Sequence, residues 1–279
     1  MSSYNTGQTN GSHVTNGGRD DGETTALLKK PQGHAITDRL GKHLTAKLDR
    51  SWADLILLLC YVVTGLLDSS AVFIYGCFVS MQTGNTIYLG LGLIEPDASD
   101  RWIKSGISIV AFCFGSFCFS RLHQTFEPTK RWVLMASYTL QMLLIAGAAL
   151  ITTFGPEISK ESPVTAWVAV PLVMIAIQSA GQTVTSRALQ YNGTTSVVLT
   201  SSYTDLFSDP KLFTSSLRDN PERNRRLVAP FLLLAGALMG GLFEHDNVGL
   251  AGALWIATSI KALIVIIWFF WKADPKPEE

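Results

Sequence analysis

The chain has 279 residues and a formal net charge of +0, with 16% charged and 47% apolar residues. Soluble domains carry about 25% charged residues, so this composition argues against an ordinary soluble protein. The balanced charge gives no indication of a nucleic-acid partner, and we expect none.

Residues 1–50 differ from the rest of the chain, because they hold small polar and charged residues without a sustained apolar run. Such a segment cannot bury enough apolar surface to offset the entropy of ordering, so we expect a disordered cytosolic tail. Residues 1–30 lack the apolar core of a signal peptide, so the first membrane segment is expected to direct insertion. The stretch ETTALL (23–28) matches an acidic dileucine sorting pattern, with chance occurrence as the alternative. A plasma membrane and a vacuolar or endosomal membrane therefore both stay open.

Apolar stretches dominate residues 51–272, which predicts an all-α, polytopic membrane helix bundle followed by a short tail at 273–279. A helix needs about 20 mostly apolar residues to cross a bilayer. Two shorter stretches, 77–94 and 194–206, mix apolar with polar residues. The segments long enough to cross are 53–75, 105–122, 132–154, 164–188, 227–244 and 249–271.

The distribution of Lys and Arg indicates the orientation. These residues cluster in 29–50, in loop 121–131 and in loop 207–226, which places these regions and both termini in the cytosol. Regions 53–94 and 164–206 must then each make an odd number of crossings. The simplest topology that meets this condition has about six net crossings, with two interrupted or re-entrant segments. The alternative is eight full crossings, which puts the basic residues of loop 121–131 outside.

The two halves, about 51–154 and 164–271, follow the same plan of a long helix, an interrupted segment and two further helices. Three net crossings in each half would give the halves opposite orientations. Inverted internal repeats of this kind are common in transporters, which bind their substrate near mid-membrane at discontinuous helices.

The stretch SMQTGNTIYLG (80–90) places amides and hydroxyls inside an apolar region. Lipid offers no hydrogen-bond partners, so irregular backbone at this depth lies inside protein or along a wet cavity. Gly84 favours a break in the helix, and a half-helix end facing a cavity can bind an ion or a polar solute. The alternative is that these groups only hold neighbouring helices together. The expected binding residues in the two interrupted segments are Gln82, Thr83, Gly84, Asn85 and Thr86, together with Thr194, Thr195 and Thr200.

Two ionisable residues, Asp68 and Lys261, lie well inside apolar segments. An ionisable side chain at this depth indicates a functional site by default. We expect Asp68 to pair with Lys261 or to bind a proton or cation. The alternatives are a purely structural ion pair and a lysine whose stem reaches the membrane surface. An anchor at the inner interface is the favoured alternative for Arg187. The residues expected to extend the same polar lining are Gln178, Gln182, Thr183 and Arg187.

Small residues four positions apart predict close helix packing, and packing is favoured over a ligand role for all of them. All five histidines lie outside the apolar centres, so no metal site or histidine-based nucleophile is expected at depth. We expect no enzymatic activity and no cofactor, and the chain contains no phosphate-binding GxxxxGK[ST] motif. The small pairs are Gly65 with Ser69, Ser116 with Ser120, and Gly236 with Gly240.

The stretch GLLDSSAVFIYGCFVSMQTGNTIYLGLGL (65–93) resembles the YoaK-like family of multi-pass membrane proteins, a domain of unknown function. The second half is similar to that family at 177–182 and 194–206. The resemblance would run from about residue 50 to 272, and it implies a membrane topology without an assigned substrate. The residues that match the family pattern are Gly65, Asp68, Phe78, Val79, Ser80, Thr83, Gly84, Asn85 and Thr86.

Together these features favour a small-solute transporter or channel-like carrier with a polar mid-membrane cavity. The expected partners are the lipid bilayer and an unidentified small solute, and the sequence is compatible with a homo-oligomer. The alternative function is a non-transporting membrane scaffold or accessory protein, in which the polar residues only join helices.

Overall fold

The structure is a computed structural model, and it describes residues 32–191, 197–213, 220–246 and 248–275. In this part of the chain all named elements are helices. Six of them are long and apolar enough to cross a membrane, which confirms the predicted multi-pass bundle. These six are α2 (Ala53–Ile74), α4 (Arg101–Thr125), α5 (Arg131–Phe154), α6 (Ala166–Ala188), α8 (Pro221–His245) and α9 (Gly249–Phe270).

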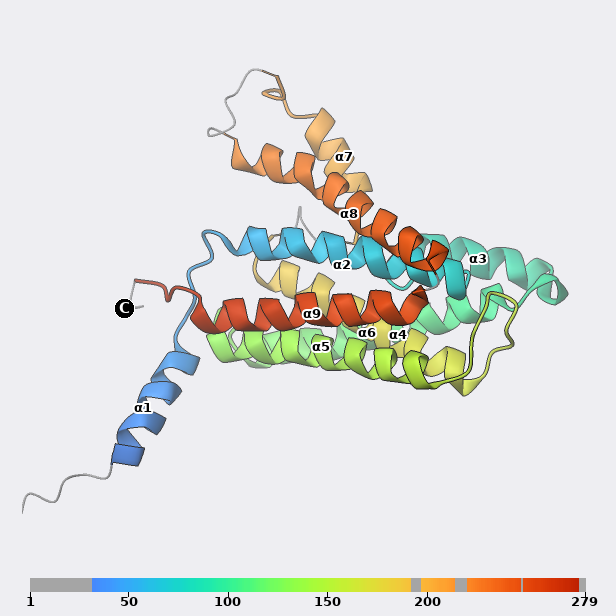
Figure 1. Cartoon of the computed structure of the whole chain (residues 1–279). Coiled ribbons are helices and arrows are strands. Elements are labelled where there is room, and N and C mark those ends of the chain that lie inside the picture. Colours follow the sequence, from blue (N-terminus) through green and yellow to red (C-terminus); the bar gives the residue numbers. More distant parts are fainter. Residues whose placement is uncertain (1–31, 192–196, 214–219, 247, 276–279) are drawn as a thin grey trace, which may run out of the picture. The chain divides into compact units, whose positions relative to one another are not determined.

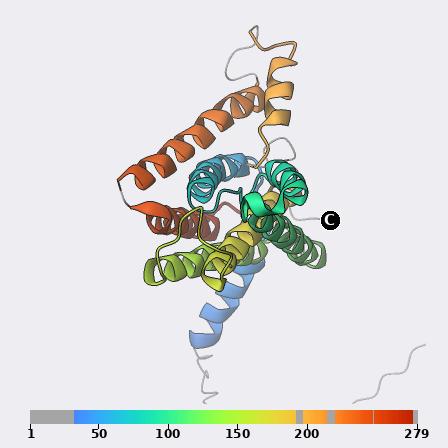
Figure 2. The same ribbon diagram turned by 90° about the vertical axis from the view of Figure 1, so that its right-hand side faces the viewer.

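The long helices pack in pairs that join the two halves of the chain (Figures 1 and 2). α2 packs along α8, α4 along α6, and α5 along α9. If α2, α4 and α5 are matched in order with α6, α8 and α9, the same set of pairs results. The pair α2–α8 becomes α6–α4, and the pair α5–α9 becomes itself. Since each half has three long helices, the second half starts at the opposite end of the bundle from the first. This is the pairing that an inverted internal repeat requires.

Glycines allow the paired helices to approach closely. A Cβ atom at Gly65 would lie 2.0 Å from the backbone oxygen of Leu233, and one at Gly236 would lie 2.1 Å from that of Val62. In the equivalent pair, a Cβ at Gly115 of α4 would lie 2.9 Å from the backbone oxygen of Ile177. The predicted close packing at Gly65 and Gly236 is therefore confirmed.

The first interrupted segment is re-entrant. After α2, residues 75–81 turn back into the bundle before α3 (Gln82–Ile94) begins. The turn uses Gly76 at φ 77°, a backbone conformation that glycine adopts without steric cost. The segment returns as far as Asp68, six residues before the end of α2, which corresponds to about 9 Å along the helix.

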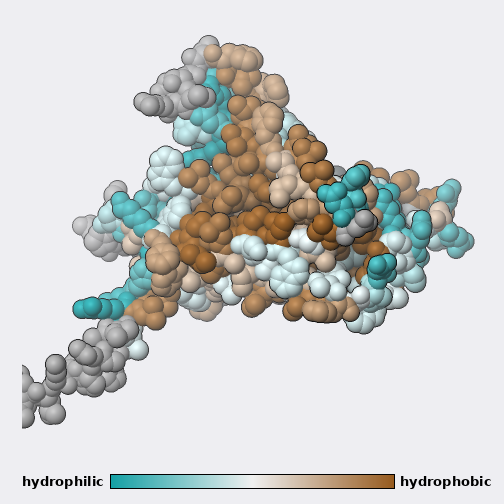
Figure 3. Space-filling view, viewed as in Figure 1, coloured by the Kyte–Doolittle hydropathy of each residue, from teal (hydrophilic) through white to brown (hydrophobic). Residues whose placement is uncertain are grey.

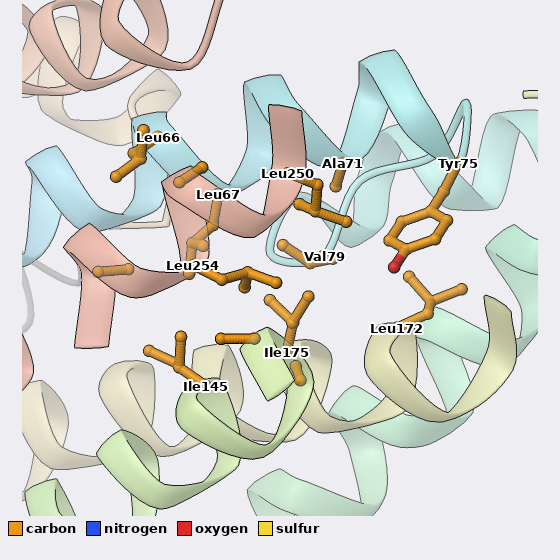
Figure 4. Close-up of a cluster of buried hydrophobic side chains, with 14 of the residues drawn as sticks. Leu66, Leu67, Ala71, Tyr75, Val79, Ile145, Leu172, Ile175, Leu250 and Leu254 are labelled. Carbon is orange, nitrogen blue, oxygen red and sulfur yellow. The ribbon is translucent and has the colours of Figure 1, made fainter. Parts of the chain in front are cut away.

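The returning segment is fixed in the core of the bundle. Val79 lies in a buried cluster with Ala71 of α2, Ile175 of α6 and Leu254 of α9 (Figure 4). Tyr75, at the start of the segment, belongs to the same cluster. The chain leaves α3 through a short 3-10 helix, Pro96–Ala98, and continues into α4.

The second interrupted segment differs from the first. α7 (Thr200–Phe207) packs on α8, and Figure 1 shows it apart from α3. Thr200 is exposed, while Thr194 and Thr195 lie outside the described residues. The prediction that this segment joins the first in one polar lining is wrong for Thr200.

Large apolar side chains remain exposed on the long helices, as expected for helices in contact with lipid. Figure 3 shows this apolar surface in brown over α8 and the neighbouring part of the bundle. On α8 the exposed residues include Phe231, Leu234, Leu238 and Leu242.

The prediction of disorder through residue 50 is corrected for residues 32–50, and residues 1–31 lie outside the described residues. The structure has a helix, α1, over Gln32–Thr45. Apolar residues recur at 36, 40 and 44, a helical spacing that the polar composition obscured. After α1, backbone hydrogen bonds join residues 46–49 to the residues before α5 and after α9. Leu48 N donates to Thr129 O at 2.9 Å, and Asp49 N donates to Lys272 O at 3.1 Å.

Candidate functional site

The carboxylate of Asp68 fixes the re-entrant segment. Its Oδ1 atom accepts hydrogen bonds from the backbone N–H groups of Val79 at 2.8 Å and Ser80 at 3.0 Å. Its Oδ2 atom accepts from the Ser80 hydroxyl. Asp68 is 3% exposed, and these bonds satisfy backbone donors that would otherwise be buried without acceptors. Asp68 therefore supports the backbone of the segment.

Asn85, in the first turn of α3, holds Phe78 in the middle of the segment. Its Oδ1 accepts from Phe78 N at 2.9 Å, and its Nδ2 donates to Phe78 O at 2.7 Å. Nδ2 also lies 2.8 Å from Gln82 Oε1 and 3.2 Å from Ser108 Oγ of α4. In the described part of the chain, the side chain of Thr86 bonds to Gln82 O of its own helix. Asn85, at the centre of the predicted polar cluster, is thus buried and paired.

The predicted ion pair between Asp68 and Lys261 is wrong. The ammonium group of Lys261 donates to Gln141 Oε1 and to Gln182 Oε1, each at 2.7 Å, and lies 5.1 Å from the ring centre of Tyr138. The physical reason is that the returning backbone already satisfies Asp68, while amide oxygens on α5 and α6 satisfy the lysine. Lys261 is fully buried, so its stem does not reach the membrane surface.

The two predicted glutamines of α6 both lie inside the protein. Gln182 completes the surroundings of Lys261, and its Nε2 donates to Thr64 Oγ1 at 2.8 Å. Gln178 is 1% exposed and donates to the neighbouring Ser179 hydroxyl at 3.1 Å. Neither is found among the described residues that line the cavities below. The expectation that they extend a wet lining is therefore corrected.

A cavity does begin at the polar cluster. Its volume is about 520 Å³, and we name it the α4–α6 cleft. Ser80, Gln82 and Thr83 line its inner end, so Gln82 and Thr83 of the predicted site border open space. Gly84 is not among the lining residues, and a Cβ there would lie 2.7 Å from the ring of Phe78. The remaining lining residues are Phe112, Ser116, Ser120, His123, Gln124, Pro128, Thr183, Val184, Arg187, Ala188, Val197 and Val198.

One polar face of α4 runs along the cleft. Ser116, Ser120 and His123 follow each other at spacings of four and three residues, which places them on one side of a helix. Ser116 and Ser120, which were predicted as packing positions, both line the cavity. His123 was missed, since the histidine lies near the end of an apolar segment and was excluded for that reason. The polar spacing along α4 could have indicated it.

The imidazole of His123 is 7% exposed and hydrogen-bonded on one side only. Its Nε2 lies 3.2 Å from the Thr185 hydroxyl, and that hydroxyl donates to Gly181 O at 2.8 Å. The single proton of Thr185 is thus engaged, so we assign the N–H of His123 to Nε2 and an acceptor lone pair to Nδ1. Nδ1 is buried and has no hydrogen-bond partner among the described residues.

A second cavity, of about 470 Å³, lies at the other end of the re-entrant segment, and we name it the Tyr75 cavity. Its residues include Tyr75, Gly76 and Arg101. The guanidinium of Arg101 donates to Gly76 O and lies 3.4 Å from the ring centre of Tyr88 on α3. Residues 77–79 therefore separate the residues of this cavity from Ser80 and Gln82 of the α4–α6 cleft.

A search of the described residues finds no group of three or more His, Cys, Asp or Glu side chains placed to hold a metal ion. No curated protein and no solved structure matches the chain. A family model described as "Protein of unknown function (DUF1275)" matches residues 56–267. This match includes Asp68 and Asn85, the two side chains that hold the re-entrant segment. It also covers all six long helices in whole or in part. The chain therefore belongs to the DUF1275 family, the YoaK-like family of multi-pass membrane proteins.

Proposed function

We propose that this protein is a transporter or channel-like carrier for a small polar solute. One observation carries the proposal: the re-entrant segment 75–81 has the α4–α6 cleft at one end and the Tyr75 cavity at the other. Polar lining in a membrane domain is expensive unless it encloses water or a ligand. Discontinuous helices at the meeting point of two inverted halves are the usual place for a transport site.

In this proposal, residues 77–79 close the route between the two cavities. The closure is held by Asp68 on α2 and by Asn85 on α3, so passage of a solute requires the segment to move relative to at least one of them. The α4–α6 cleft lies towards the end of the bundle that carries Arg121, Lys130 and Arg131, which we assign to the cytosolic side. We expect the protein to catalyse no chemical reaction.

Blocking the cleft tests the proposal. The purified chain is reconstituted in liposomes, and uptake of a panel of radiolabelled small solutes is compared with that of empty liposomes. Ser120→Trp fills the cleft, and Cys118→Trp places the same side chain on the exposed face of the same helix. We expect uptake by the unaltered chain, loss of uptake with Ser120→Trp and retention with Cys118→Trp. Circular dichroism confirms that both variants keep their helices.

The proposal fails if the unaltered chain moves none of the solutes, or if Ser120→Trp transports as well as Cys118→Trp. The second candidate function is a non-transporting scaffold. It is favoured by the complete pairing of Asp68 and Asn85, neither of which is among the described residues lining the two cavities. For a scaffold, substitutions at these two residues lower stability, and no variant or wild-type chain produces uptake.

A further inference from the structure

The charge in the α4–α6 cleft has one sign. Among the described residues that line it, Arg187 of α6 is the charged side chain, and Asp and Glu are absent. No hydrogen bond or ion pair of the Arg187 guanidinium is found in the described part of the chain. A guanidinium without a carboxylate partner favours an anion over a cation in the same cavity.

The inner end of the cleft has the same preference. Ser80, Gln82 and Thr83 lie at the start of α3, which has 13 residues. The N-terminal end of a helix carries a partial positive charge that favours an anionic group nearby. A solute in the cleft therefore meets positive potential from α3 at one end and from Arg187 on α6.

The wall between these ends offers hydrogen-bonding groups. Ser116, Ser120 and Gln124 line the cleft, and in the described part of the chain no hydrogen bond of their side chains is found. His123 Nδ1 is different, because it is buried in the wall as an acceptor without a donor. An unpaired buried acceptor is costly, and a ligand that carries an O–H or N–H group removes this cost.

We propose that the α4–α6 cleft binds a small organic anion that also carries a hydroxyl or N–H group. The anionic group contacts Arg187, and the O–H or N–H group donates to His123 Nδ1. The inference rests on the proposed function, and it assigns the class of solute. A volume of about 520 Å³ accommodates a molecule of a few carbon atoms together with water.

Four small probes separate the two parts of the proposal. Lactate has a carboxylate and a hydroxyl, propionate has only the carboxylate, 1,2-propanediol has hydroxyls without charge, and ethanolamine is a cation with a hydroxyl. Binding of each to the purified full chain is measured by calorimetry at millimolar concentrations. We expect lactate to bind most tightly, with propionate and 1,2-propanediol each weaker by about tenfold or more, as for one lost charge-assisted or buried hydrogen bond.

Two variants identify the groups involved. Arg187→Gln should reduce lactate binding to the level of 1,2-propanediol, and His123→Phe should remove the preference for lactate over propionate. Arg121→Gln is the matched control, because Arg121 is exposed on α4 and lies over the ring of Phe117, outside the cleft. It should bind lactate as the unaltered chain does. Chemical unfolding of each variant shows whether it is folded.

Tighter binding of ethanolamine than of lactate, or binding of none of the four probes, overturns the proposal. Equal binding of lactate and propionate to the unaltered chain overturns the assignment of His123, even if His123→Phe does not fold. Uptake of other solutes without anion binding would contradict this inference and leave the proposed function standing. Binding of lactate without uptake in liposomes would establish the site and contradict transport.

Discussion

Replacing Asp68 by leucine tests whether this carboxylate holds the re-entrant segment in place. The substitution leaves two buried backbone N–H groups, those of Val79 and Ser80, without an acceptor. Each such group costs about 1–3 kcal/mol, so we expect the free energy of unfolding to fall by about 2–6 kcal/mol. Asp68→Asn keeps one carbonyl oxygen that can accept from both N–H groups. It should therefore lower the free energy of unfolding by only about 1–2 kcal/mol.

The assay is denaturant unfolding of the purified chain in detergent micelles, followed by circular dichroism. Ser69→Ala is the matched control on the same helix, because among the described residues the Ser69 hydroxyl donates to Leu66 O of its own helix, at 3.1 Å, and not to the re-entrant segment. We expect the control to change the free energy of unfolding by less than about 0.5 kcal/mol. If Asp68→Leu unfolds at the same denaturant concentration as Ser69→Ala, the backbone donors do not depend on Asp68 and the reasoning is refuted.

Three further predictions concern helix packing, the buried lysine and a surface ion pair. Gly65→Ala should lower the free energy of unfolding by about 1–3 kcal/mol, because its Cβ would lie 2.0 Å from Leu233 O. Gly241→Ala, with nothing within 4 Å, should not, and equal effects would contradict the packing argument. Lys261→Met should cost about 2 kcal/mol or more by leaving two amide oxygens without a donor, and adding Gln141→Leu should recover part of this. No recovery in the double variant would count against this explanation. The hydrogen bond from Lys47, at 2.6 Å, lowers the pKa of Glu127 below its usual value. The pair therefore stabilises the fold at neutral pH, and this stabilisation is lost as the pH falls through the lowered pKa. Solvent screening keeps the effect below about 1 kcal/mol, and Glu127→Gln should flatten the acid side of the stability curve. An unchanged curve would show that the pair contributes nothing measurable.

The helices were predicted well because membrane burial depends on local composition. The predicted segments 53–75 and 249–271 differ by one residue from α2 and α9. α4 (Arg101–Thr125) extends beyond the predicted segment 105–122 at both ends, and α8 begins at Pro221, six residues before the predicted segment 227–244. The start of α8 is the larger difference. Its first turns are helical despite their charges. Arg225 is paired with the buried Asp54 of α2, at 2.6 Å, and no local pattern indicates that partner.

The candidate site was predicted less well, because it depends on contacts between distant segments. The polar stretch beginning at Ser80 did indicate a re-entrant segment and a cavity. The role of Asp68 could not be predicted from side-chain types, because its partners at Val79 and Ser80 are mainly backbone N–H groups. His123 was not predicted, because it lies away from the centre of an apolar segment. Its spacing from Ser116 and Ser120, which puts all three on one face of α4, could have indicated it. Composition does not reveal that Lys261 and Asp68 have different partners, because this depends on how distant segments pack in three dimensions.

The two ends of the membrane domain are fastened to each other. Asp274 N donates to Lys47 O at 2.8 Å, Trp271 Nε1 donates to Asp49 O at 2.7 Å, and Arg131 bonds to the backbone oxygens of His43 and Trp271. The segment before α2 and the segment after α9 are therefore joined by hydrogen bonds, and the side chain of Arg131 bonds to both of them. Pulling α9 out of the bundle by mechanical force would also strain residues 46–49, which lead into α2. A cut after Trp271 would remove the partners of Asp49 N and Lys47 O, although more than two hundred residues separate them from Lys272 and Asp274 in sequence.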